Sequence, residues 1–415
     1  MIVLTHPTGN ANVRAVMGGL QRAGLLAKFA TTIGFAESER WIERLPAAIS
    51  RELRRRRYAL PKKLIFRHPG REAVRMASVK SGWRVLVGHE TGWASVDGIY
   101  RSLDRRVASE LGGWKRDLGA KAVYAYEDGA YESFAAAGEL GMLRAYDLPI
   151  AYCDTARRLL TEEAARRPEW EPTLVGTRDS ESKLERKREE ARRADVILCP
   201  SGFVYDSLPE QIRRTKQCVV AEFGSPQPRA KESRRVRNGN GPLRVLFAGS
   251  LTQRKGLADL MDAVRILNRK DIELVVLGSP VAPLEFYRKQ PVEFTYESPR
   301  PHAQVLELME RCDVFVLPSI VEGRALVQQE AMTCGLPLIV TRNAGADDLI
   351  VEGETGFLVP IRSPEAIAAK LAWMADHRGE VTAMSHAARE KAALLTWESY
   401  GDKVTAKLKK ELAAR

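Results

Sequence analysis

Residues 312–337 read Cys312-Asp-Val-Phe-Val-Leu-Pro-Ser-Ile-Val-Glu-Gly-Arg-Ala-Leu-Val-Gln-Gln-Glu-Ala-Met-Thr-Cys-Gly-Leu-Pro337. The apolar run from Val314 to Leu317 has no polar alternation, which predicts a parallel strand buried on both faces. Pro318 ends this strand, and a short helix is expected from about Arg324 to Cys334, closed by the glycine that follows. The stretch therefore predicts one strand–turn–helix unit of an α/β fold.

Two carboxylates of this stretch fall at informative positions. Glu322 lies in the turn beyond the carboxyl end of the strand, beside a helix N-terminus whose free amides attract anions. Glu330 lies about two helical turns further along. Amides suit phosphate groups and carboxylates suit vicinal hydroxyls, so the stretch favours a site for a phosphorylated sugar.

Strand-like runs alternate with helical patterns along the rest of the chain. This alternation predicts an α/β fold of two Rossmann-like doubly wound domains that face each other across a cleft. The runs expected to form strands are Ile2–Leu4, Ala27–Thr31, Arg84–Gly88, Ala122–Tyr126, Ile150–Cys153, Val196–Cys199, Cys218–Ala221, Arg244–Ala248, Glu273–Leu277, Glu293–Tyr296, Val314–Leu317 and Leu338–Val340.

The length of 415 residues also favours two domains over one core. Residues 226–242 are rich in proline, glycine and charge without periodicity, which predicts a linker. We therefore expect a first domain over 1–225 and a second domain over 243–395. The polar helix over 396–415 is expected to return to the first domain.

The cysteine content and the length of the apolar stretches indicate where in the cell the protein is expected. The five cysteines are scattered and read as reduced core residues of a cytosolic protein. The chain opens on a strand-like run without a charged leader, and no apolar stretch approaches the roughly 20 residues that span a bilayer. We therefore expect a cytoplasmic protein, peripheral at the inner face of the cell membrane if it contacts lipid.

The net charge of +12 is concentrated in one segment, because residues 51–75 hold ten Lys/Arg against two Glu. Ile49 and Leu53 add an apolar stripe one turn apart, which fits contact of residues 47–75 with an anionic membrane surface. The alternative is a solvated helix packed by its stripe onto the first domain. A nucleic-acid partner is not expected, because no aromatic platform or recognisable motif accompanies the charge.

The second domain begins with a strand, Gly249, a basic loop and a helix. Arg254 and Lys255 stand just before that helix, where a planar guanidinium and a compact ammonium make a strong site for a diphosphate. A basic pair in one such loop is weak evidence alone. Its joint occurrence with Glu322 and Glu330 at strand ends of one sheet is much stronger.

These motifs resemble those of the donor-binding half of family-4 glycosyltransferases with the GT-B fold, also called glycosyl transferases group 1. The family shows a K-G pair, a D-V-F-V-L-P-S strand and E-G-x-x-L-x-x-x-E-A-M-x-x-G-x-P. This chain has Lys255-Gly256, Asp313–Ser319 and Glu322–Pro337, followed by Gly353-Glu-Thr-Gly356. The resemblance spans roughly residues 243–400, whereas the first domain matches only in the order of its strands and helices.

The resemblance implies roles for individual residues. Glu330 would accept hydrogen bonds from ribose hydroxyls, and Glu322 in its Glu322-Gly323 pair would hold the donor sugar and phosphates. Lys255 and Arg254 would neutralise the leaving diphosphate in place of a metal. The remaining donor-binding residues implied are Gly9, Asn10 and Gly249 at strand ends, and Arg324, Ala325 and Leu326 through their backbone amides.

The chain also departs from the family pattern. The usual E-G-F-G is Glu322-Gly-Arg324-Ala325 here, which places a bulky cation near the donor sugar and makes donor choice the expected point of difference. Many relatives carry a histidine facing the reacting sugar where this chain has Asp154-Thr155, so Asp154 is the candidate catalytic residue of the first domain. Asp-x-Asp and His-Glu-x-x-His are absent from the sequence, so no metal or other cofactor is expected.

The function expected from the resemblance is that of a retaining glycosyltransferase. It would move a sugar from a nucleotide-diphosphate sugar to a hydroxyl acceptor, lipid-linked or a polysaccharide precursor. One alternative keeps the fold and changes the reaction to that of a nucleotide-sugar epimerase or a phosphorylase. Another is a non-catalytic, membrane-associated nucleotide-sugar-binding protein.

Overall fold

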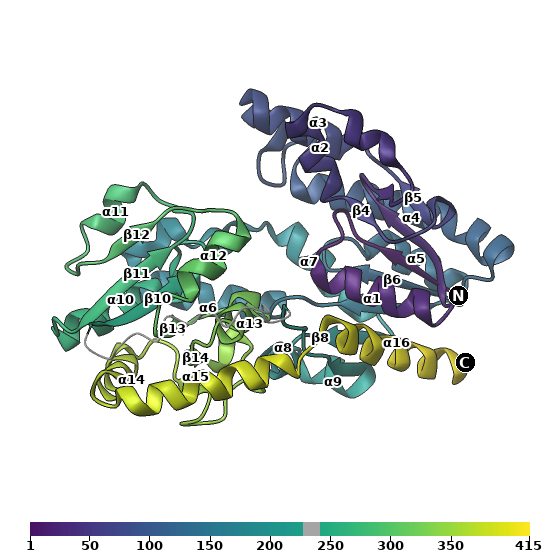
Figure 1. Ribbon diagram of the computed structural model, residues 1–415. Helices are drawn as coiled ribbons and strands as arrows, with labels where there is room; N and C mark the ends of the chain where they lie inside the picture. Colours follow the sequence, from purple (N-terminus) through teal and green to yellow (C-terminus); the bar gives the residue numbers. More distant parts are fainter. Residues whose placement is uncertain (227–240) are drawn as a thin grey trace.

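The computed structural model describes residues 1–226 and 241–415 and has two α/β domains (Figure 1). The first contains a seven-stranded sheet in which all neighbouring strands are parallel. Its spatial order is β5 (Ile65–Arg67), β2 (Leu26–Thr31), β1 (Ile2–Thr5), β6 (Ala122–Tyr126), β7 (Leu143–Asp147), β8 (Val196–Cys199) and β9 (Gln217–Val220).

The helices of this half of the chain connect these strands and include one lobe of short elements. They are α1 (Ala11–Arg22), α2 (Ala47–Arg54), α3 (Gly70–Ser81), α4 (Val96–Leu118), α5 (Tyr131–Glu139), α6 (Cys153–Arg166), α7 (Glu181–Arg193), α8 (Gly202–Ser207) and α9 (Glu210–Thr215). The lobe holds α2, α3 and the two-stranded pair β3 (Phe35–Ala36) and β4 (Arg57–Tyr58), and Figure 1 shows its helices at the top of the domain.

The second domain has a six-stranded parallel sheet in the doubly wound order. Its strands are β12 (Thr295–Glu297), β11 (Ile272–Leu277), β10 (Leu243–Ala248), β13 (Val314–Leu317), β14 (Leu338–Thr341) and β15 (Gly356–Val359). Its helices are α10 (Leu257–Leu267), α11 (Leu284–Arg288), α12 (His302–Met309), α13 (Leu326–Thr333), α14 (Pro364–Asp376) and α15 (Arg378–Ala393).

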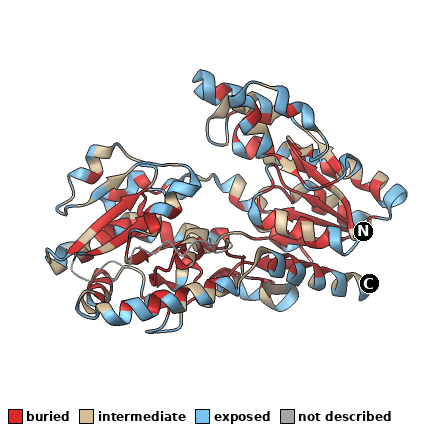
Figure 2. Cartoon of the chain, viewed as in Figure 1, coloured by how far each residue is buried: buried red, intermediate tan, exposed pale blue. Residues whose placement is uncertain are grey.

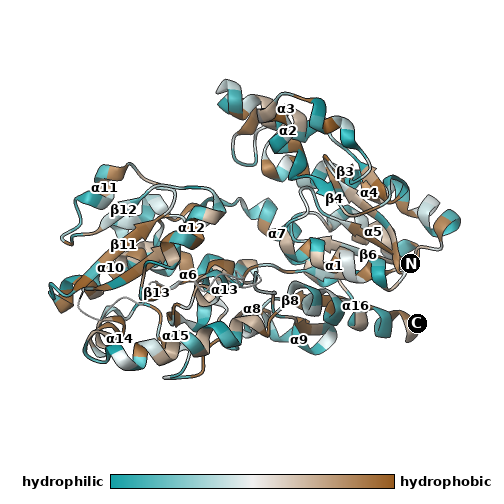
Figure 3. Cartoon of the chain, viewed as in Figure 1, coloured by the Kyte–Doolittle hydropathy of each residue, from teal (hydrophilic) through white to brown (hydrophobic). Residues whose placement is uncertain are grey.

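In both sheets the strand order reverses beside the first strand, between β1 and β6 and between β10 and β13. Ligands of doubly wound folds bind at such a switch point, beyond the carboxyl ends of the strands. The central strands are apolar and buried because helices cover both faces, as Figures 2 and 3 show for the red and brown interiors of the two domains. The architecture therefore directs attention to the loops after β1, β6, β10 and β13.

One segment of the first half of the chain packs on the second domain. Trp170, in the 3₁₀ helix η4 (Pro168–Thr173) after α6, is buried in the hydrophobic core of the second domain. Its ring packs edge-on against Phe286 and Tyr287, with centroids 5.0 and 5.8 Å away. The two sheets divide the chain at the linker, but the segment around Trp170, which precedes the linker, packs with the second domain.

The last helix, α16 (Trp397–Ala413), lies along α1 of the first domain (Figure 1). The two backbones approach so closely that a Cβ on Gly401 would stand 2.2 Å from the carbonyl oxygen of Ala15. A Cβ on Gly19 would stand 2.6 Å from the carbonyl oxygen of Gly401. Small residues at both positions therefore permit this contact.

Two expected strands are wrong. Arg84–Val87 is a 3₁₀ helix, η3, which lies between α3 and a loop and pairs with no strand of the described sheets. The strand expected at Ile150–Cys153 is instead β7, seven residues earlier at its start, and Cys153 begins α6. The helix expected from Arg324 begins at Leu326.

The proposed linker over 226–242 falls almost wholly outside the described residues, which resume at Gly241. Among the described helices, none combines the length and apolar character that crossing a membrane requires.

Candidate active site

Glu322 joins the loops that follow β10 and β13. Its Oε1 atom accepts hydrogen bonds from Lys255 Nζ at 2.5 Å and pairs with Arg254 Nη1 at 2.9 Å. Burial alone would raise the pKa of the Glu322 carboxyl, but the charges of Arg254 and Lys255 and their hydrogen bonds outweigh it and lower the pKa. The carboxylate is thus held ionised between two cations at the switch point of the second sheet.

Glycines shape this loop. Gly249 has φ +147°, and a Cβ there would stand 3.0 Å from Cδ and Cε of Lys255, so its bare backbone seats the lysine stem. Gly256 has φ +75°, and its Cβ position is only 2.1 Å from the carbonyl oxygen of Pro318. The loop after β10 therefore lies directly against the end of β13, which brings the cations to Glu322.

Residues of the first half of the chain hydrogen-bond to the loop that carries Arg254 and Lys255 and hold it in place. Gln253 is fully buried; its Nε2 donates to Glu163 and Asp259 at 2.7 and 2.8 Å, and its backbone N–H donates to Thr173 Oγ1 at 3.1 Å. Glu163 and Thr173 belong to α6 and η4, while Gln253 directly precedes Arg254. This anchor was not predicted from the sequence.

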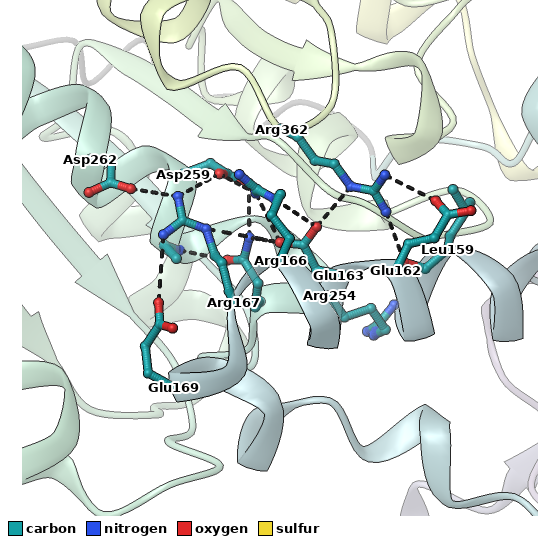
Figure 4. Close-up of polar contacts among 12 residues, drawn as sticks. Leu159, Glu162, Glu163, Arg166, Arg167, Glu169, Arg254, Asp259, Asp262 and Arg362 are labelled. Carbon is teal, nitrogen blue, oxygen red and sulfur yellow. Dashed lines mark hydrogen bonds and ion pairs between the residues drawn. The ribbon is translucent and has the colours of Figure 1, made fainter.

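A charged network surrounds the same contact, and Figure 4 shows it bridging α6 and the second domain. Arg166 and Arg167 both reach Asp259, at 2.5 and 3.0 Å. Arg362 pairs with Glu163 at 2.8 Å and with Glu162 at 3.0 Å. The α6 segment is consequently bonded to the second domain by ions as well as by Trp170.

Glu330 lies on α13 and faces α12. Its Oε1 atom is 3.0 Å from Nε2 of His302, the first residue of α12. Both side chains retain access to solvent. His302 follows the strand β12, whose carboxyl end lies at the same edge of the sheet. The order of strands could have placed it near Glu330, but no sequence motif marked it.

The side chain of Arg324, which the sequence predicted as a bulky cation near the donor sugar, is bonded within the second domain in this structure. Its side chain is buried, and its guanidinium binds both oxygens of Asp348 at 2.5 and 2.9 Å. Its Nε donates to Gln329 at 3.1 Å, and Nη1 donates to the carbonyl oxygen of Gly345 at 3.3 Å. Bidentate pairing of a buried guanidinium explains the inward orientation.

The backbone around Arg324 is partly engaged as well. The amide of Ala325 donates to the carbonyl oxygen of Ala344 at 3.2 Å, so it is not free for a phosphate in this conformation. Leu326 opens α13, and its side chain packs against a core of the first domain. Of the three expected amides, those of Arg324 and Leu326 have no hydrogen-bond partner within residues 1–226 and 241–415 that would compete with a ligand.

Gly323 marks a contact between the domains. A Cβ there would stand 1.7 Å from the carbonyl oxygen of Pro149, and the carbonyl oxygen of Gly323 accepts a hydrogen bond from Ser201 Oγ at 2.7 Å. Any larger residue would push the loop after β7 away. Gly323 therefore brings the first domain next to Glu322.

Gly9 and Asn10 follow β1, at the switch point of the first sheet. The amides of Thr8 and Gly9 donate to Nδ1 of His6, at 3.0 and 2.8 Å, and Tyr58 covers the side of Gly9 where a Cβ would be. Burial lowers the pKa of His6 to about 3, so its ring is neutral and can accept both bonds. Asn10 caps α1 through a bond from the amide of Val13.

These bonds change the expected role of the loop. The amides of Thr8 and Gly9 already donate to His6 within the protein. In this conformation they are therefore not free to bind the phosphates of a donor. The exposed Asn10 side chain remains available, with Nδ2 only 3.4 Å from the hydroxyl of Tyr126.

Asp154 lies in the first turn of α6, not after a strand. Its carboxylate is half exposed and binds Arg188 of α7 in a fork, with the shortest contact at 2.7 Å. A more buried carboxylate lies at the end of β6: Glu127, paired with Lys187 at 3.5 Å. Burial raises the pKa of Glu127 to about 7, although Lys187 acts in the opposite direction.

The cations of residues 51–75 are less free than the sequence suggested. Arg56 and Arg75 bind the buried Glu72, while Arg57 and Arg67 bind Glu43 and Glu39. Within the described ranges, four basic side chains of this segment have no polar partner: Arg51, Arg54, Lys62 and Lys63. Ile49 of the stripe is exposed, so α2 is not fully packed by its apolar face.

One group of side chains in the described ranges has metal-ligand spacing: His89, Glu90 and Asp179. Lys183 Nζ lies 2.9 Å from Asp179, and Glu90 accepts hydrogen bonds from Ser180. Because an ammonium already neutralises Asp179, these three residues are better described as part of a hydrogen-bonded cluster that joins the loop after η3 to α7.

The fold and the position of the site define a class. The chain matches solved structures over its full length: sucrose-phosphate synthase from Thermosynechococcus elongatus (TM-score 0.67, 17% identity, covering 100% of this chain and 99% of that one) and Anabaena Alr3699/HepE in complex with UDP-glucose (TM-score 0.61, 14% identity, 99% of each chain). The protein has the GT-B fold, as expected from the sequence.

Residues 228–391 match the family described as glycosyl transferases group 1. The second domain is therefore a glycosyl transferases group 1 domain, which confirms the resemblance. Similar curated proteins are the D-inositol 3-phosphate glycosyltransferase of Corynebacterium glutamicum (31% identity, 46% of this chain, 50% of that protein) and the putative colanic acid biosynthesis glycosyltransferase WcaL of Salmonella typhimurium (29%, 49% and 53%). The chain spans about half the length of these relatives.

Proposed function

We propose that this protein is a retaining glycosyltransferase that uses a nucleotide-diphosphate sugar. The observation that carries the proposal is the buried Glu322–Lys255–Arg254 cluster at the switch point of a group 1 domain. Support also comes from the neighbour Alr3699/HepE, which was solved with UDP-glucose. In this proposal the two cations bind the diphosphate, and Glu330 binds the ribose.

The reaction would proceed without a covalent enzyme intermediate. The bond between the anomeric carbon and the phosphate oxygen breaks, and its electron pair stays on the departing diphosphate. The acceptor hydroxyl attacks the anomeric carbon from the same face, and its proton passes to the departing phosphate. Lys255 and Arg254 stabilise the negative charge that develops, so the protein contributes position and electrostatics.

The acceptor would be a hydroxyl of a lipid-linked or polysaccharide precursor. Support comes from the name of the relative WcaL and of the amylovoran biosynthesis glycosyltransferase AmsK of Erwinia amylovora, 28% identical over 46% of this chain. The free cations at Arg51, Arg54, Lys62 and Lys63 favour an anionic membrane surface as a further partner.

Nucleotide binding is the first test. Thermal unfolding with UDP, GDP and ADP sugars should show one nucleotide that stabilises the protein, by about 2.7 kcal/mol at 100 times its Kd. Glu330→Ala should remove most of that shift, whereas Glu307→Ala, an exposed position on α12, should keep it. If no nucleotide sugar shifts the transition, the donor assignment is wrong.

Product analysis then separates the reactions. Incubation of the donor with membrane lipid extract should yield free nucleotide diphosphate and a glycosylated lipid in equal amounts. Conversion of the nucleotide sugar into an isomer without acceptor would identify an epimerase. Binding without any turnover would favour a non-catalytic nucleotide-sugar-binding protein.

A further inference from the structure

The stretch from α3 to the start of α4 exposes an unusual set of apolar side chains. Val85 is 89% exposed, Trp83 66%, Val96 63%, Val79 60% and Trp93 50%. These five residues, here called the apolar rim, lie within 18 positions of the sequence. Large apolar side chains gathered on a surface mark an interaction site, whereas single ones do not.

Helix contacts and hydrogen bonds join the segments that carry the apolar rim. α3 contacts both η3 and α4, and the amide of Ala94 donates to the carbonyl oxygen of Leu86 at 2.8 Å. Arg71, in the first turn of α3, donates to the carbonyl oxygen of Trp93 at 2.6 Å and stacks over its ring at 4.8 Å. The rim is therefore built on hydrogen-bonded backbone and is not a loose tail.

Cations border the apolar rim. Lys80, Arg84 and Arg105 have no carboxylate partner within residues 1–226 and 241–415. Partial burial lowers the pKa of the Arg71 guanidinium, and nearby Arg105 and Arg101 lower it further, which places three guanidinium groups in one neighbourhood.

The acids of the same stretch do not offset this charge. Glu72 is buried between Arg56 and Arg75, and Glu90 is bonded to Ser180. Asp97 is buried and paired with Arg186. The exposed charge around the rim is consequently positive.

We propose that the apolar rim, with Lys80, Arg84 and Arg105, docks the first domain onto an anionic lipid bilayer. Tryptophan and β-branched side chains enter the headgroup region while the flanking cations bind anionic headgroups. A second copy of this chain is a poorer occupant, because a symmetric contact would place the same cations against one another.

This surface extends beyond the basic segment 47–75, since it adds insertion of side chains to electrostatic attraction. The membrane docking depends on the proposed function only for its biological role, which is to bring a lipid-linked acceptor to the enzyme. The two-part character also sets the expected lipid dependence: anionic lipid should be required for recruitment, and the rim should be required for retention.

Flotation with vesicles tests the proposal on the full chain. The protein should float with phosphatidylcholine vesicles that contain about 30% phosphatidylglycerol and not with phosphatidylcholine alone. Two double variants test the two parts of the surface: Trp83→Ser with Val85→Ser, and Lys80→Glu with Arg84→Glu. Each should lower the partition coefficient of the protein between water and vesicles about tenfold. Fluorescence quenching by lipids brominated on the acyl chains should fall in the first variant.

Matched controls use exposed residues elsewhere. Leu394→Ser removes a side chain that is 77% exposed, and Lys409→Glu with Lys410→Glu reverses two exposed charges on α16; both should bind vesicles as the wild type does. The proposal is overturned if the wild type does not float, or if the rim variants float as well as it does. The thermal shift by nucleotide reports the donor site separately, so failure here and failure of the proposed function are distinguishable.

Discussion

Lys255 Nζ and Arg254 Nη1 share one oxygen of Glu322, which lies in the loop after β13, and no other carboxylate of the described chain pairs with either cation. The relationship joins the first and fourth strands of the second domain at their carboxyl ends. A diphosphate placed there would meet two positive groups already fixed by Gly249 and Gly256. The energy for assembling those charges is thus spent in folding and not in binding.

Lys255→Ala should lower turnover more than donor affinity, because the ammonium is proposed to stabilise charge that develops as the diphosphate leaves. We expect kcat to fall by about 10²–10³ and the nucleotide Kd to rise much less. Steady-state kinetics and calorimetric titration with the nucleotide measure the two effects. Lys289→Ala, an exposed lysine after α11, is the control, and an unchanged kcat in Lys255→Ala would remove the leaving-group role.

Glu322→Gln should destabilise the protein at neutral pH by about 2–3 kcal/mol, since two cations then lack their counter-ion. The folded-state pKa of Glu322 is lowered, so its stabilising effect is complete above the unfolded-state pKa and is lost as pH falls through the folded one. The difference between wild type and Glu322→Gln in urea unfolding should therefore shrink below about pH 4. A difference that is constant from neutral to acid pH would contradict this.

The strands of the second domain were predicted more accurately from the sequence than those of the first. Between residues 243 and 341, apolar runs without alternation predicted β10, β11, β13 and β14, and Val314–Leu317 matches β13 residue for residue. β12 begins two residues later than expected, and β15 was not predicted. Such runs are reliable where helices cover both faces. Arg84–Val87 shows the limit of this rule, because the same kind of run forms a 3₁₀ helix with no buried residue and pairs with no described strand.

The site shows the same division between local and long-range information. The sequence predicts Glu322 after one strand and the two cations after another. The two strands are neighbours in the sheet, so the three side chains meet at one edge. The pairing of Arg324 with Asp348 was not predicted because the two residues are 24 positions apart, and no local pattern signals a buried bidentate pair. Gln253 was missed because its partner Glu163 comes from the other half of the chain.

Arg324→Met should test the inward orientation of that side chain. Removing the guanidinium leaves Asp348 and the Gly345 carbonyl without their donor, so we expect a loss of about 1–3 kcal/mol in the free energy of unfolding. The relative KM values for different sugar donors should stay the same, since the side chain does not face the donor. A change in donor preference with unaltered stability would restore the expectation from the sequence.

Trp170→Ala should destabilise the second domain although Trp170 precedes the linker. The indole is buried against Phe286 and Tyr287, so its removal leaves a cavity and should cost about 3–5 kcal/mol. Trp170→Phe, which keeps an aromatic ring in place, should cost less. Amide hydrogen exchange read by mass spectrometry should show lost protection in β10 and β11 of the alanine variant, while β1 and β6 keep theirs. Equal loss in both sheets would mean that the α6 segment does not belong with the second domain in energetic terms.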